Sequence, residues 1–105
     1  MVTQVAANLE KGELRQLADA HRDRIKSGVV IIASKVDDRV VVVVSVSKDL
    51  AGRVHAGQIV KQIAPIVGGS GGGRPDFAEA GGKDGSRVAD LLTEGRRMVE
   101  EMLGQ

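Results

Sequence analysis

Few side chains in this sequence could carry covalent chemistry. The chain has 105 residues, no cysteine and two histidines, which excludes disulfides, thiolate zinc sites and cysteine nucleophiles. His21 falls on the apolar stripe of an expected helix, a position typical of a semi-buried structural histidine. Asp37 and Asp38 separate two valine-rich runs, as turn residues do, and Ser70 lacks the strand-to-helix elbow of a serine nucleophile. The sequence therefore predicts neither catalytic residues nor metal ligands.

The glycine-rich segment 68–82 could instead bind a ligand through its backbone. It holds seven of the 14 glycines. A Walker A loop is excluded because no Lys-Ser/Thr pair and no strand frame the segment, and a Rossmann loop because a helix precedes it. Two interpretations stay open: the glycines allow tight packing against a sheet, or their amides form an anion-binding nest with Arg74 and Lys83 at its rim. In both cases Gly72→Val is expected to damage folding, and Arg74 is either a ligand contact or a structural brace.

The composition is that of a globular domain, and it limits the possible partners. The net charge is +1, so no bulk basicity indicates a nucleic acid, although residues 48–83 carry five basic and three acidic side chains. The only aromatic residue is Phe77, which excludes single-strand readers that stack bases on aromatic platforms. No apolar run approaches the roughly 20 residues of a membrane span, and no N-terminal signal pattern occurs. We expect a cytoplasmic protein with no membrane partner.

The apolar pattern predicts one α+β domain over residues 1–105. Two unbroken runs of mostly β-branched residues, 29–33 and 40–44, indicate buried strands joined as an antiparallel hairpin. A short strand is expected at 3–9, ahead of a helix. Because a strand–helix–strand crossover makes its two strands parallel or nearly adjacent, the sheet is expected to be mixed.

Helical periodicity occurs in three segments. They are 13–27, 55–63 and about 86–103, and the second must kink or finish at Pro65, which lacks a backbone donor. The predicted architecture is a mixed β-sheet (strand–helix–hairpin) with about three helices packed on it and a glycine-rich loop before the C-terminal helix.

The segment 71–82, Gly-Gly-Gly-Arg-Pro-Asp-Phe-Ala-Glu-Ala-Gly-Gly, resembles a signature at the C-terminal end of bacterial alanyl-tRNA synthetases. The segments 48–50, 56–57 and 63–69 also look like that family, as does the order of strand, helix, valine-rich hairpin, helix, glycine loop and terminal helix. The resemblance covers essentially the whole chain. The chain is thus similar to the globular C-terminal (DHH-associated) domain of an alanyl-tRNA synthetase.

This resemblance implies a module without catalytic residues of its own. The parent enzyme of such a module attaches alanine to tRNA(Ala) and edits mischarged tRNA; it is implied to use ATP, Mg and Zn, and no cofactor is expected in this chain. The implied role is to bind tRNA(Ala) at its outer corner and to link aminoacylation and editing, with the remaining synthetase domains as further partners. The residues expected at the tRNA are Gly71, Gly72, Gly73, Arg74, Pro75, Lys83, Lys61, Lys48, Arg53 and His55.

Two alternatives stay open. Family members self-associate chiefly through a helical part that this chain largely lacks, so one alternative is a structural or dimerisation module, with a weak homodimer expected. The same domain occurs in DHH-type phosphoesterases, where a Gly-Gly-Gly-His sequence helps to hold a nucleotide. Here Arg74 stands in place of that histidine, and an arginine is not a proton shuttle at neutral pH. The substitution favours the synthetase branch and leaves a nucleotide-binding phosphoesterase domain as the second alternative.

Overall fold

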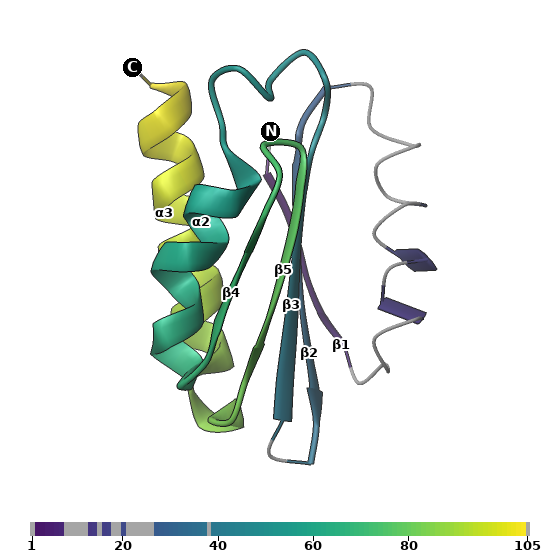
Figure 1. The fold of residues 1–105 in the computed structure, drawn as a ribbon, viewed down its shortest axis with the longest axis vertical. Coiled ribbons are helices and arrows are strands. Elements are labelled where there is room, and N and C mark those ends of the chain that lie inside the picture. Colours follow the sequence, from purple (N-terminus) through teal and green to yellow (C-terminus); the bar gives the residue numbers. More distant parts are fainter. Residues whose placement is uncertain are drawn as a thin grey trace.

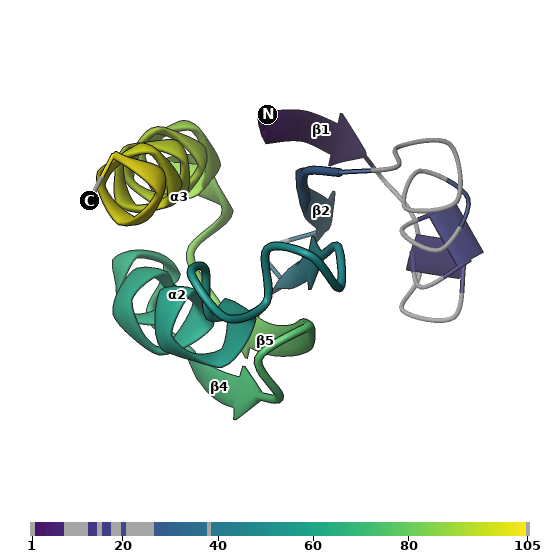
Figure 2. The same cartoon turned by 90° about the horizontal axis from the view of Figure 1, so that it is seen from above.

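The computed structural model describes residues 2–7, 13–14, 16–17, 20, 27–37 and 39–104, in which a five-stranded sheet curves around two α-helices (Figures 1 and 2). The strands are β1 (Val2–Ala7), β2 (Val29–Val36), β3 (Arg39–Val46), β4 (Ser70–Gly73) and β5 (Phe77–Gly82). The helical elements are α2 (Ala56–Ile63), α3 (Val88–Leu103) and the short 3₁₀ segments η1 (Ala64–Val67) and η2 (Gly85–Arg87). The predicted α+β class is confirmed.

The sheet is mixed, as the sequence predicts. Its strand order is β1-β2-β3-β5-β4; β1 runs parallel to β2, and the other neighbouring pairs are antiparallel. The valine-rich runs form the central β2–β3 hairpin, in which Ile32 pairs with Val43. Asp37 has a φ of 56°, a left-handed turn conformation that aspartate tolerates better than most residues, so its predicted turn role is confirmed.

Both faces of the central strands are buried. On the face covered by α2 and α3, Ile31 and its alternate neighbours belong to the larger apolar cluster. On the opposite face, Val30, Ile32 and Val43 pack with Leu14. This two-sided burial explains why β2 reads as an unbroken apolar run instead of an alternating one.

The two described helices lie close to their predicted positions. α2 ends at Ile63, and the chain continues through Pro65 as η1, whose C-cap residue Gly68 has a φ of 68°. The last helix begins at Val88 rather than at about Ser86, because η2 intervenes. Most of the helix predicted at 13–27, including His21, falls outside the described residues, although 13, 14, 16, 17 and 20 are helical. None of the helices in the described part of the chain is long and apolar enough to cross a membrane.

The predicted glycine-rich loop is wrong, since this segment forms the antiparallel β4–β5 hairpin at the edge of the sheet. Gly71, Gly72 and Gly73 have no side chains, so the sequence cannot show the alternation of apolar and polar residues by which a strand is recognised. The hairpin needs glycine at Gly73, where a Cβ would come 2.7 Å from the Ala78 Cα, and at Gly71, where it would overlap Ala80. Nothing lies within 4 Å of a Cβ at Gly72, which contradicts the close packing on which the prediction for Gly72→Val rests.

Candidate nucleic-acid interface

The turn formed by residues 74–76 joins β4 to β5 and also closes the loop formed by residues 47–55, which connects β3 to α2. Three successive carbonyls of the 74–76 turn accept amide hydrogen bonds from residues at the two ends of this loop. The bonds run from Val46 N to Asp76 O (2.8 Å), from Ala56 N to Pro75 O (2.9 Å) and from Gly57 N to Arg74 O (3.1 Å). The backbone of the turn is therefore part of the framework of the fold.

The side chains of the turn are left at the surface. Arg74 is 76% exposed and Asp76 is 41% exposed, and the Arg74 Nε lies 3.6 Å from the Asp76 Oδ1, which is longer than a hydrogen bond. Such a surface ion pair contributes little to stability. The carbonyl of Arg74 thus stabilises the fold, whereas the guanidinium of Arg74 is open to a ligand.

The 47–55 loop is held at its start by hydrogen bonds to the beginning of β2. The Ser47 amide donates to the Gly28 carbonyl at 3.0 Å, and the Ser47 Oγ accepts from the Gly28 amide at 2.9 Å. The Ser27 hydroxyl donates to the Asp49 carboxylate at 2.5 Å. This bond, together with one from Ser47, holds the pKa of Asp49 below its ordinary value. The exposed Lys48 is therefore presented from an ordered backbone.

The later part of the 47–55 loop is tied to the end of α3. The Arg53 Nη2 donates to the Leu103 carbonyl at 2.7 Å, where it also opposes the negative end of the helix dipole. The Arg53 side chain is thus partly engaged in the fold.

His55 caps α2 instead of projecting freely. Its Nδ1 accepts from the Gln58 amide at 3.1 Å, and its side chain is partly buried. The amides of Ala56 and Gly57 donate to the 74–76 turn, so three amides at the start of α2 have protein partners.

The anion-binding nest suggested for the glycine-rich segment does not form in β4, because successive amides of a strand alternate in direction.

The structure divides the predicted site residues between two ends of the fold (Figure 1). The 74–76 turn, the 47–55 loop and His55 lie at one end, together with the end of α3. Lys61 is in the last turn of α2 and Lys83 follows β5, where its amide donates to the Val67 carbonyl at 2.8 Å. Lys61 lies toward the far end of α2, a helix of about 12 Å, and Lys83 follows the far end of β5, a strand of about 20 Å, so both are removed from Arg74.

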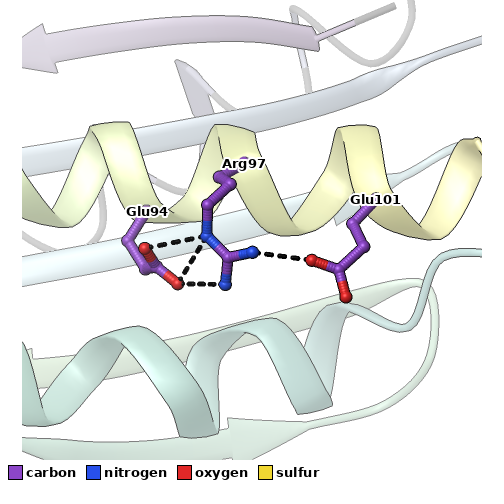
Figure 3. Close-up of polar contacts among 3 residues, drawn as sticks. All are labelled: Glu94, Arg97 and Glu101. Carbon is purple, nitrogen blue, oxygen red and sulfur yellow. Dashed lines mark hydrogen bonds and ion pairs between the residues drawn. The ribbon is translucent and has the colours of Figure 1, made fainter.

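The arginines of α3 are engaged with acids on the same helix. Figure 3 shows Arg97 between Glu94 and Glu101, with its Nη2 2.5 Å from one carboxylate and its Nη1 2.6 Å from the other. The bonds to Glu94 and then Glu101 raise the pKa of Arg97, while the pKa of Glu94 is lowered. Arg96 forms only a looser ion pair, with its Nε 3.6 Å from the Glu100 Oε1. Because Arg97 is held between two carboxylates, its guanidinium is a poor phosphate-binding group.

Several other cations lack acidic partners within the described residues. They are Arg39, Lys48, Lys61 and Lys83. Sequence reasoning did not select Arg39, whose exposed position at the start of β3 gave no motif signal, nor did it select Asp76, although Asp76 stands beside Arg74 in the signature. The described residues contain no group of three His, Asp or Glu side chains that could hold a metal ion.

Comparison with known proteins agrees with the resemblance seen in the sequence. Residues 1–101 match the DHHA1 domain family. The alanine–tRNA ligase of Pelotomaculum thermopropionicum is 46% identical over 99 residues, which are 93% of this chain and 11% of that protein. The alanine–tRNA ligase of Solibacter usitatus is 47% identical over 102 residues, 94% of this chain and 12% of that protein. The chain thus spans about a tenth of the length of these curated relatives.

A solved structure extends the likeness to the fold. The C-Ala domain from Aquifex aeolicus alanyl-tRNA synthetase superposes with a TM-score of 0.83 at 33% identity, covering 99% of this chain and 91% of that one. The shared sequence and fold therefore place the chain in the DHHA1 domain family, among the C-Ala domains of alanyl-tRNA synthetases.

Proposed function

We propose that this chain is a non-catalytic module of an alanine–tRNA ligase and binds tRNA(Ala) through the end of the fold that carries the 74–76 turn. One observation supports this site above others: the fold uses the backbone of the turn, while the Arg74 side chain is 76% exposed. A guanidinium on an ordered turn can bind phosphate bidentately without much loss of conformational entropy. Lys48, on the 47–55 loop that this turn closes, is exposed and has no acidic partner in the described part of the chain.

The proposed mode of recognition is by shape and backbone. The chain lacks the aromatic residues that stack on unpaired bases, and a folded tRNA offers phosphates and riboses at a surface of fixed shape. Binding at the outer corner of the tRNA would let the module connect the aminoacylation and editing sites of the parent enzyme. The ATP, Mg and Zn implied for the parent would be bound by its other domains.

Titration of labelled tRNA(Ala) with this chain at two salt concentrations tests the proposal. Three phosphate contacts, from Lys48, Arg53 and Arg74, predict that affinity falls roughly 20- to 40-fold between about 50 and 200 mM salt. An unrelated tRNA of similar size is the control for selectivity. Absence of any binding at the lower salt concentration would contradict the proposed function.

A further inference from the structure

Asp49 and Asp76 both lie at the proposed RNA-binding end, and the fold uses the side chain of Asp49 but not that of Asp76. The Asp49 carboxylate accepts hydrogen bonds from the hydroxyls of Ser27 and Ser47, and the bond from Ser27 ties the 47–55 loop to the residues just before β2. The Asp76 carboxylate accepts no hydrogen bond in the part of the chain that the structure describes, and its ion pair with Arg74 is long. The fold uses the carbonyl of Asp76, and not its side chain.

An acid at this position would be unfavourable if the turn bound only phosphate. A negative charge 3.6 Å from the guanidinium of Arg74 repels the same phosphate that the guanidinium attracts. The pair instead offers hydrogen-bond donors beside a strong acceptor. The complementary ligand has an acceptor and a donor side by side, as a nucleotide does when a phosphate or base carbonyl lies near a 2′-hydroxyl or a base N–H.

The backbone that carries this donor and acceptor is ordered before binding. The carbonyls of residues 74, 75 and 76 accept from β3 and α2, and the Arg74 amide donates to the Phe77 carbonyl at 2.9 Å. Because the backbone of the turn is already ordered, its two side chains can meet a ligand with little further loss of backbone entropy.

From this geometry we infer that the Asp76 carboxylate accepts a hydrogen bond from a donor group of the bound RNA while Arg74 binds a neighbouring acceptor. The inference rests on the proposed function. It makes the 74–76 turn a reader of a nucleotide's donor and acceptor together, and it makes Asp76 a specificity-determining residue.

The test compares the affinity of the wild type, Asp76→Asn and Asp90→Asn for a tRNA(Ala) transcript. Asp90 is a matched control because it also pairs with an exposed arginine, Arg87 at 3.3 Å, but at the start of α3, remote from the 74–76 turn. Loss of a charged acceptor predicts about tenfold weaker binding for Asp76→Asn, and no weakening is expected for Asp90→Asn. Asp76→Ser, which suits a turn and also removes the charge, serves if the Asn variant fails to fold.

Equal or tighter binding by Asp76→Asn, with the wild type still binding RNA, overturns this inference and leaves the proposed function intact. No binding by the wild type removes both. Measuring the effect of Asp76→Asn on a 2′-deoxy copy of the transcript identifies the nucleotide group that donates to Asp76. Loss of the Asp76 effect on this copy assigns the donor to a 2′-hydroxyl, and persistence of the effect assigns it to a base N–H; both results support a nucleotide donor at Asp76.

Discussion

The amide nitrogen of Ala56 lies 2.9 Å from the carbonyl oxygen of Pro75, and this bond joins the first turn of α2 to the turn between β4 and β5. In the Gly-Arg-Pro-Asp signature the backbone thus stabilises the fold, and the side chains remain available for binding. The glycines and the carbonyls belong to the fold, whereas the side chains of Arg74 and Asp76 face the solvent. Substitutions at neighbouring positions of one motif should therefore affect stability and binding separately.

Arg74→Ala tests whether the side chain of Arg74 contributes to RNA binding and not to stability. We expect affinity for tRNA(Ala) to fall roughly tenfold, because a charged hydrogen bond to phosphate is lost. The free energy of unfolding should change by no more than about 0.5 kcal/mol, since the side chain is 76% exposed. Binding by fluorescence anisotropy and urea unfolding measure the two quantities.

Arg96→Ala is the matched control for that variant. Arg96 is also exposed and also lies 3.6 Å from a carboxylate, that of Glu100, but it is on α3. Its loss should leave the dissociation constant within about twofold of the wild type, a change of roughly 0.4 kcal/mol. If both variants bind equally weakly, net charge and not the 74–76 turn governs binding.

The sequence predicts most of the fold but not the hairpin that carries the candidate site. The runs that became β2 and β3 and the stripes of α2 and α3 are recognisable because side chains reveal which face is buried. In β4 three of the four residues are glycines, so no alternation of side chains reveals a buried face, and the strand is held by backbone pairing to β5. Lys61 and Lys83 illustrate the same limit for the site, because neighbours along a basic stretch are separated when α2 and β5 lead away from the turn.

Two glycine substitutions test which glycines of β4 the fold requires. Gly73→Ala places a Cβ 2.7 Å from the Ala78 Cα, and relief of that overlap is expected to cost about 1–3 kcal/mol. Gly72→Ala meets nothing within 4 Å, so it should be neutral or stabilise by about 0.4–1 kcal/mol through the unfolded state. Urea unfolding of both variants makes the comparison, and equal destabilisation would contradict the arrangement of β4.

His55 is expected to contribute to stability as a helix cap. His55→Ala removes the Nδ1 acceptor of the Gln58 amide and should lower the free energy of unfolding by about 1 kcal/mol. His55→Asn supplies another acceptor at the same position and should recover most of that loss. Thermal unfolding of the three proteins measures it, and an Asn variant as unstable as the Ala variant would count against capping.

Asp49 is expected to make stability depend on pH at the acid end. Hydrogen bonds from Ser27 and then Ser47 hold its pKa in the folded state below the value of about 3.9 in the unfolded chain. The carboxylate therefore stabilises the fold above that value, and the stabilisation is lost as pH falls through the folded pKa. Asp49→Asn should be less stable than the wild type at pH 7, with the difference vanishing as the pH falls below the folded pKa.

Ser27→Ala should show a smaller difference with the same trend, because the bond from Ser47 remains. Urea midpoints measured from neutral to acid pH follow all three proteins, and a gap for Asp49→Asn that stays constant over this range would show that the loop is not held by the charged carboxylate.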